Sequence, residues 1–90
     1  KRYAQYCFTS CNGIDLVNGL TFSTDLDITL IRACRKNCNK LVVLADHTKF
    51  GMTYYFKTLS IKEIDIIITD QEPEEKWITY CEENGITLIY

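Results

Sequence analysis

The ninety residues predict a single α/β domain with a mostly parallel sheet flanked by helices. The runs at 41–45, 64–69 and 86–90 are nearly continuous in apolar and β-branched residues, as in parallel strands covered on both faces. Segments of helical periodicity separate these runs. No internal repeat, low-complexity tract or linker interrupts the chain, so the sequence gives no reason to draw a second domain boundary.

The first elements expected are a strand over residues 6–11 and a helix over about 25–38. The strand runs into Asn12-Gly13-Ile14-Asp15, where an amide and a glycine are typical of a turn. Thr24 followed by Asp27 resembles a capping box with the shorter acid. The apolar positions of the helix, close to a helical period, are Leu26, Leu30, Ala33, Cys34 and Cys38.

The second half predicts a strand over 41–45, another over 64–69, a helix, and a last strand over 86–90. The helix begins near Pro73, carries acidic residues in its first turn, and ends before Gly85. Residues 53–62 are ambiguous: Tyr55, Leu59 and Lys62 fit a helical turn, whereas the aromatic residues favour a strand. We expect a short crossover there.

The number of predicted helices does not match the number of buried strands. Strands covered on both faces need helices on two sides, and only two helices are convincing, so apolar surface should remain uncovered. Either the chain dimerises, or it is the second half of a longer domain. The start at Lys1 without a methionine favours a fragment.

Composition excludes several classes of function. A net charge of −2 without a basic stripe argues against direct nucleic-acid binding by these residues. No apolar run approaches the roughly 20 residues that a membrane span needs, so we expect no membrane partner. The five cysteines match no common CxxC pattern, and Cys34 and Cys38 are one turn apart on the predicted helix. We expect reduced, mostly buried thiols and a cytoplasmic location, with metal ligation or a disulfide as alternatives.

Polar residues follow three of the predicted strands. Asp46 and Lys49 come directly after the run 41–44, Asn12 and Gly13 follow the first strand, and Asp70 follows the run 64–69. The carboxyl ends of parallel strands open on the ligand-binding crevice of an open α/β sheet. A binding site is therefore predicted there. The alternative is ordinary turn chemistry, with Asp46 and Lys49 forming a surface pair worth less than about 1 kcal/mol.

These residues, in order and spacing, resemble the C-terminal sensor domain of DeoR-type transcriptional repressors over essentially the whole chain. The Asp-x-x-Lys-Phe-Gly segment is fairly specific in combination with the Gly-Leu-Thr and Thr-Asp elements. The segments that carry the resemblance are Asn12-Gly13-Ile14-Asp15, Gly19-Leu20-Thr21, Asp27, Leu44-Ala45-Asp46-His47-Thr48-Lys49-Phe50-Gly51, Ile64-Asp65 and Ile68-Thr69-Asp70.

The resemblance implies a ribose-5-phosphate isomerase-like (Rossmann-like) fold and a sensor for a sugar phosphate that controls a carbohydrate operon. The chain would be the second half of the sensor domain, without the helix-turn-helix that binds operator DNA. It implies a cytoplasmic homo-oligomer with no cofactor, no metal and no catalytic residue. The implied effector-binding residues are Asn12, Gly13 and Asp15 around the sugar, Gly19 and Thr21 in the next turn, Asp27, and Asp46 and Lys49 on the opposite wall.

Four positions depart from the pattern that the family often shows, namely Asn12, Asp27, Ile31 and His47. Asp27 is a methylene shorter than the glutamate of the relatives, and Ile31 stands where a lysine is common. Asn12 places a neutral amide where a carboxylate is common, which repels phosphate less. His47 replaces a common serine. It is either a solvent-facing loop residue or a pH-sensitive ligand contact.

Two other functions compete with sensing. A sugar-phosphate isomerase of the same fold would use Asp27 or Asp46 as a general base, but residues 18–22 contain a single glycine, too few for its phosphate loop. A purely oligomerising module would instead use the leftover apolar surface to pair subunits.

Overall fold

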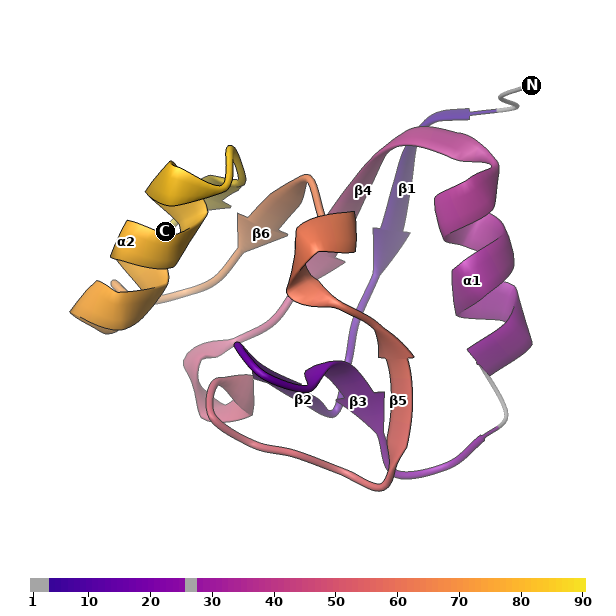
Figure 1. Ribbon diagram of the computed structural model, residues 1–90, viewed down its shortest axis with the longest axis horizontal. Helices are drawn as coiled ribbons and strands as arrows, with labels where there is room; N and C mark the ends of the chain where they lie inside the picture. Colours follow the sequence, from indigo (N-terminus) through magenta and orange to yellow (C-terminus); the bar gives the residue numbers. More distant parts are fainter. Residues whose placement is uncertain (1–3, 26–27) are drawn as a thin grey trace.

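The computed structural model describes residues 4–25 and 28–90, which form a parallel sheet, a small antiparallel sheet and two α-helices (Figure 1). The α/β class with helices flanking a parallel sheet is as predicted. In chain order the elements are β1 (Ala4–Thr9), β2 (Gly13–Asp15), β3 (Gly19–Phe22), α1 (Ile28–Lys36), β4 (Cys38–Leu44), the 3-10 helix η1 (His47–Lys49), β5 (Phe56–Leu59), the 3-10 helix η2 (Ile61–Glu63), β6 (Ile66–Ile68), α2 (Glu75–Glu83) and β7 (Thr87–Ile89).

The large sheet has the strand order β1-β4-β6-β7, and every pair in it is parallel. Successive strands are added in one direction across the sheet. Because parallel crossovers are almost always right-handed, connections that all step in one direction fall on the same face. The helices α1 and α2 therefore share one face of the large sheet.

The small sheet, of order β2-β3-β5, was not predicted. Residues 13–15, expected in a loop, form β2, and the expected crossover at 53–62 contains β5 and η2 instead. Both strand pairs are antiparallel, and β3 carries an irregularity between Leu20 and Thr21. Strands of three or four residues are too short to show an alternating pattern, which is why sequence periodicity missed them.

Element boundaries differ from the expected ones by a few residues. The strand β1 begins and ends two residues earlier than predicted, because Ser10 and Cys11 already leave the sheet. The helix α1 ends at Lys36, and both the backbone and the side-chain amide of Asn37 donate to the Ala33 carbonyl. Cys38, predicted on the helix, therefore begins β4. The proposed capping partner Asp27 lies outside the described residues.

The helix α2 begins at Glu75, two residues after Pro73, and ends at Glu83. Gly85 follows with φ +69°, and the Ile86 amide donates to the Cys81 carbonyl at 2.9 Å. This left-handed glycine ends the helix where the sequence predicted. No helix in the described part of the chain is long and apolar enough to cross a membrane.

One face of the large sheet forms the hydrophobic core. Leu41 and Val43 of β4 and Ile67 of β6 point into a buried cluster that also contains Trp77 of α2 and Ile31 of α1. The small sheet contributes to the same cluster through Ile14 and Leu20. Both helices and the small sheet therefore pack on this one face.

The opposite face of the large sheet carries the apolar surface that the helix count predicted to be left over. Tyr6 and Phe8 of β1 are 56% and 61% exposed. Val42 lies beside Phe8 in the register and is 2% exposed, yet it is not part of the core cluster. Leu44 and Ile89 are also exposed large apolar residues. A row of apolar side chains thus lies on a face that no described helix covers.

Arg35 connects α1 to the large sheet. Its guanidinium lies 2.7 Å from Asp65 Oδ2 and donates to the backbone carbonyls of Glu63, Cys38 and Asn39. The same Asp65 oxygen accepts from the Leu41 amide at 2.8 Å. The Asp65 carboxylate, which directly precedes β6, therefore joins α1 to β4.

Candidate functional site

The carboxyl ends of β1, β4 and β6 meet at one edge of the large sheet. Leu44 pairs with Ile68 in the register, and the Ala45 amide donates to the Ile68 carbonyl at 3.0 Å. The residues that follow the two strands, Asp46 and Asp70, are therefore neighbours. Together with the last residues of β4 and β6 they line an open cavity of about 400 Å³.

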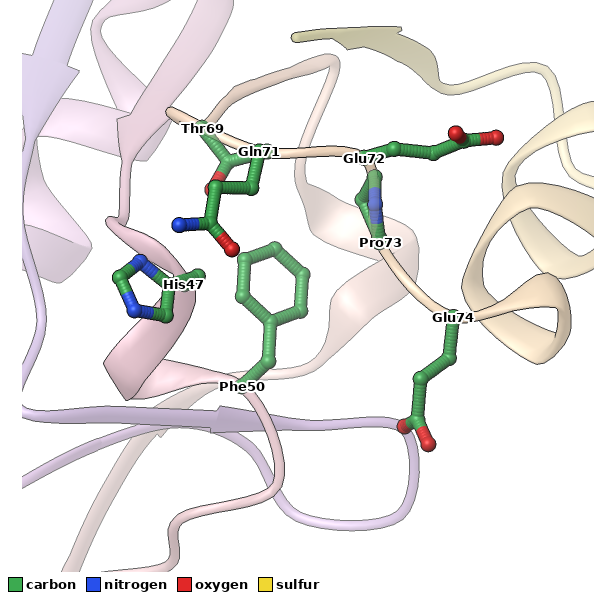
Figure 2. A pocket seen from close by; sticks show the side chains of 7 residues that line it. All are labelled: His47, Phe50, Thr69, Gln71, Glu72, Pro73 and Glu74. Atoms are coloured by element: carbon green, nitrogen blue, oxygen red, sulfur yellow. The ribbon is translucent and has the colours of Figure 1, made fainter.

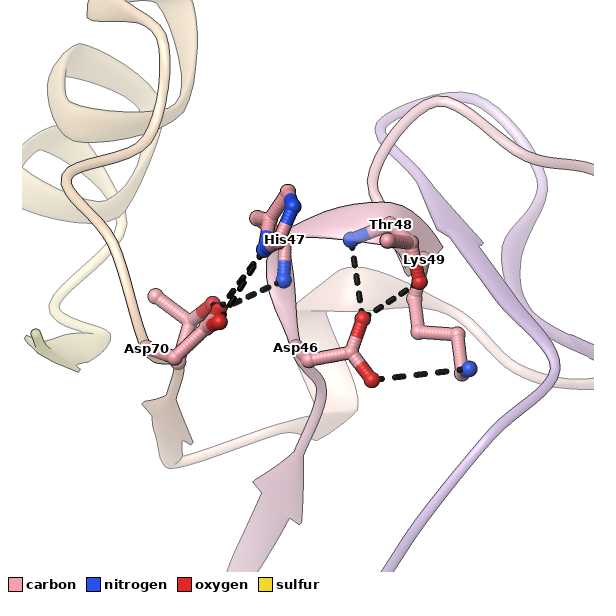
Figure 3. A network of polar contacts seen from close by, with 6 residues as sticks. Asp46, His47, Thr48, Lys49 and Asp70 are labelled. Atoms are coloured by element: carbon pink, nitrogen blue, oxygen red, sulfur yellow. Dashed lines mark hydrogen bonds and ion pairs between the residues drawn. The ribbon is translucent and has the colours of Figure 1, made fainter.

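Asp46 organises the turn after β4 (Figure 3). It is the N-cap of η1, and its Oδ1 accepts from the Thr48 amide at 2.9 Å and from the Thr48 hydroxyl. These hydrogen bonds, and to a smaller extent the Lys49 ammonium, lower the Asp46 pKa. The carboxylate is therefore ionised at neutral pH, and it stays open to solvent.

Lys49 lies on the same turn and faces the other oxygen of Asp46. Its Nζ is 3.6 Å from Asp46 Oδ2, longer than a hydrogen bond, and its side chain is about one third exposed. The ammonium is held beside Asp46 by charge, without a hydrogen bond to the carboxylate. It can therefore turn toward an incoming anion.

His47 joins the loop after β4 to the loop after β6 (Figure 3). Its backbone amide donates to Asp70 Oδ1 at 2.7 Å, and its ring Nδ1 lies 3.0 Å from Asp70 Oδ2. Hydrogen bonds from the His47 ring and then its amide lower the Asp70 pKa. His47 is thus a half-exposed loop residue with a defined partner, and sequence reasoning did not find this pairing.

The loop after β1 reaches the same place through Cys11. Cys11 is buried, and burial raises its pKa to about 12; the Lys49 charge lowers it and the Asp46 charge raises it. The Gly51 amide donates to the Ile14 carbonyl at 2.8 Å, and Ile14 and Phe50 form an isolated bridge. The three strand ends therefore converge, as the parallel arrangement predicted.

Asn12 and Asp15 use their side chains to fix the backbone of the small sheet. Asn12 Oδ1 accepts from the Ser23 amide at 2.9 Å. The Asp15 carboxylate accepts from the amides of Val17 and Asn18 at 2.8 and 2.7 Å, and from the Thr53 hydroxyl. Its pKa is lowered because these hydrogen bonds outweigh burial, which acts in the opposite direction. Both side chains therefore fix the backbone in and around the small sheet.

The other predicted residues of this region are placed by packing. Thr21 is fully buried in β3, not in a turn, and its hydroxyl accepts from the Tyr54 amide at 2.8 Å. A Cβ at Gly13 would lie 2.3 Å from the Met52 carbonyl oxygen, and one at Gly19, where φ is +75°, would lie 2.0 Å from that of Leu59. Close backbone approach explains both glycines. Asp27 lies outside the described residues.

A second cavity, of about 220 Å³, adjoins the turn on the side of α2 (Figure 2). Figure 2 shows Gln71 lying over the Phe50 ring with its amide toward His47, while Glu72 and Glu74 point away from it. The residues that line the cavity are His47, Phe50, Thr69, Gln71, Glu72, Pro73 and Glu74. Gln71 follows Thr69-Asp70 directly, and its position after the strand β6 is the signal that could have identified it.

The strand ends offer two ionised carboxylates, an ammonium and an imidazole around open space. Such groups bind hydroxyl and anionic oxygens. Among the described residues, no group of three or more His, Cys, Asp or Glu side chains could hold a metal ion. Cys11, whose thiol is protonated at neutral pH, is not an activated nucleophile.

The fold and this edge together define an α/β domain with a polar crevice at the carboxyl ends of its parallel strands. The family model of the DeoR C terminal sensor domain matches residues 1–71, and the chain belongs to that family.

Relatives of known role are similar along most of the chain. It is 37% identical over 70 residues to the HTH-type transcriptional regulator GolR of Listeria innocua, and 29% identical over 72 residues to the HTH-type transcriptional repressor GlcR of Bacillus subtilis. These matches cover 78% and 80% of this chain and 28% of each relative. The deoxyribose operon repressor of Escherichia coli K12 is 26% identical over 83 residues, 92% of this chain and 33% of that protein. The chain thus spans about three tenths of the length of these relatives.

Proposed function

We propose that this chain is the effector-binding part of a transcriptional repressor of a carbohydrate-metabolism operon, and that the effector is a phosphorylated sugar. Membership of the sensor-domain family supports the role, and the names of the relatives support the link to repression. The observation that carries the proposal is that Asp46 and Asp70 line one open cavity, while the Lys49 ammonium lies 3.6 Å from Asp46 Oδ2.

Two of these side chains, Lys49 and Asp46, have distinct tasks in this proposal. The Lys49 ammonium contacts a phosphate or sugar oxygen as a compact point charge. Asp46 Oδ2, which no Thr48 group occupies, accepts a sugar hydroxyl. The predicted residues Asn12, Gly13, Asp15, Gly19 and Thr21 act indirectly, since they fix the loops that surround the cavity.

Binding without catalysis fits the electrostatics of the site. A general base for proton abstraction works best when its pKa is close to the working pH. The pKa values of Asp46 and Asp70 are lowered instead, so both carboxylates are weak bases. Incubation with ribose 5-phosphate should therefore yield no ketose above background, and measurable ketose formation would favour the isomerase alternative.

The remaining partners belong to the longer protein. In our proposal operator DNA is bound by a helix-turn-helix domain outside these ninety residues, and the protein is a cytoplasmic homo-oligomer. Repressors with such domains read paired half-sites as dimers. The sugar phosphate would change operator affinity through a coupling free energy between two sites.

We also propose that these residues are the second half of the sensor domain. The apolar face around Phe8 and Val42 supports this, since parallel sheets are covered on both sides. Helices on that face require crossovers that step in the opposite direction, and β1 has an open edge where such strands would pair. Sedimentation of the ninety-residue chain should show self-association, whereas a monomer at high concentration would count against an uncovered face.

A thermal-shift screen of the longer protein tests the main proposal. A panel of phosphorylated pentoses and hexoses is compared with the unphosphorylated sugars and with inorganic phosphate. At a hundred-fold excess over its Kd, the true effector stabilises the fold by about 2.7 kcal/mol. Lys49→Ala should abolish this shift, and Lys76→Ala, an exposed lysine on α2, should keep it. A panel without any shift, or an undiminished shift in Lys49→Ala, refutes the proposal.

A further inference from the structure

Three of the five thiols gather away from the effector site. Cys7 lies on β1, Cys34 on the last turns of α1, and Cys38 is the first residue of β4. They share a cavity of about 250 Å³ whose lining is Ala4, Cys7, Ala33, Cys34, Asn37 and Cys38. Because Cys38 begins β4 and Asp46 follows its end, the cavity lies toward the amino end of the sheet.

The three thiols differ in access to solvent. Cys38 is 1% exposed and its Sγ faces the Arg35 carbonyl oxygen at 3.9 Å, whereas Cys7 and Cys34 are partly exposed. Ala4 and Ala33 also line the cavity, and their short side chains leave space beside the thiols. A small reagent therefore reaches Cys7 and Cys34 before it reaches Cys38.

The thiols are also close to one another. Burial, followed by hydrogen bonds and charge interactions with Cys34 and, to a smaller extent, with Cys38, raises the Cys7 pKa to about 11. All five cysteines are free in the structure. Disulfides that form in a reducing compartment are usually transient, and they are catalytic or redox-sensing.

We propose that Cys7 and Cys34 form a reversible dithiol–disulfide site that fastens α1 to β1 in the presence of a low-molecular-weight disulfide such as oxidised glutathione. The Cys34 thiolate attacks one sulfur of the reagent, breaks its S–S bond and releases one glutathione thiolate. Cys7 then loses its proton to water and attacks Cys34 Sγ, which forms the protein disulfide and releases the second glutathione. Two protein thiols are oxidised and one disulfide is reduced to two thiols.

The cross-link would join elements that are far apart in sequence. The helix α1 is the helix whose Arg35 holds Asp65 and the adjacent backbone carbonyls. A disulfide from Cys34 to Cys7 would fix the same helix to the edge strand β1 as well. The inference is independent of the proposed effector, because none of its residues lines the effector cavity.

Peptide mapping of the folded chain tests the proposal. The chain is treated with oxidised glutathione at neutral pH, the remaining thiols are alkylated, and digested peptides are identified by mass. We expect one cross-linked peptide pair containing Cys7 and Cys34, with Cys11, Cys38 and Cys81 alkylated, and full reversal by dithiothreitol. Cys34→Ser should abolish the cross-link, whereas Cys38→Ala should retain it.

Other results would overturn the proposal. These are a cross-link that contains Cys38, a stable glutathione adduct on Cys34 without closure, or thiols that all remain alkylatable. Circular dichroism of each variant shows whether it is folded. If Cys34→Ser is unfolded, the peptide maps of the wild-type chain and of Cys38→Ala still decide the outcome. Each map reports directly which two sulfurs are joined.

Discussion

Replacing Asp65 should reveal how strongly one carboxylate holds α1 on the large sheet. Asp65→Ala removes the partner of Arg35 and leaves the Leu41 amide, in the fully buried part of β4, without an acceptor. An unpaired buried amide costs about 1–3 kcal/mol. The loss of the ion pair adds about 1 kcal/mol, because both side chains keep 21% and 29% exposure and Arg35 retains three carbonyl partners.

Asp65→Ala should therefore lower the free energy of unfolding by about 2–4 kcal/mol. Asp65→Asn keeps an acceptor for the Leu41 amide and should cost only about 1–2 kcal/mol. Urea unfolding followed by circular dichroism measures both values, and Glu82→Gln on the exposed face of α2 is the control, expected within about 0.5 kcal/mol of wild type.

The pH dependence of this difference is fixed in sign. Burial raises the Asp65 pKa, but hydrogen bonds from Leu41 and Arg35 outweigh it and the net shift is downward from 3.8. The contribution of Asp65 is therefore complete above the unfolded-state pKa and is lost as the pH falls through the folded-state pKa. The gap between wild type and Asp65→Asn should close at low pH. Equal stability of all three proteins at pH 7, or a gap that stays constant to pH 2, would refute the reasoning.

Three further changes test the small sheet and the strand-end turn. At Gly19 and Gly85 φ is positive, so an alanine at either position is strained by about 1–2 kcal/mol. At Gly19 the added Cβ also clashes with the Leu59 backbone, so Gly19→Ala should lower the melting temperature more than Gly85→Ala does. Equal losses in thermal unfolding would contradict the close approach at Gly19. Thr21→Val leaves the Tyr54 amide without its acceptor and should lower the free energy of unfolding, measured in urea, by about 1–3 kcal/mol. A loss below about 0.5 kcal/mol would contradict that hydrogen bond. Asp70→Asn should leave thermal stability nearly unchanged but weaken effector binding measured by calorimetry, and unchanged affinity would exclude Asp70 from the site.

Much of the large sheet was predictable because its strands have a strong local signal. Continuous apolar runs identified β4, β6 and β7, and the same continuity predicted their parallel direction. Parallel strands end on one edge, so the neighbourhood of Asp46 and Asp70 was also predictable. The helix count correctly indicated uncovered apolar surface, now located around Tyr6 and Phe8.

The small sheet was not predictable from local patterns. Thr21 and Gly19 were interpreted as loop residues near a ligand, whereas their positions are set by β5, which is almost forty residues further along the chain. A side chain that accepts a hydrogen bond from a distant amide, as Thr21 does from Tyr54, has the same sequence signature as one that contacts a ligand. Short strands paired by long-range contacts carry too few residues to show their period.

By itself the sequence determined the α/β class, the ends of the parallel strands and the turn at Asp46 and Lys49. Apolar runs and turn residues set the backbone conformation within a few residues along the chain, so a local pattern is enough to predict them. Only the tertiary structure decided that Asp15 accepts from Thr53 and Thr21 from Tyr54, that His47 pairs with Asp70, and that Cys7 and Cys34 line one cavity. Each of these contacts joins segments separated by a turn or by whole elements. Their partners are chosen by how the layers pack, and no local pattern encodes that choice.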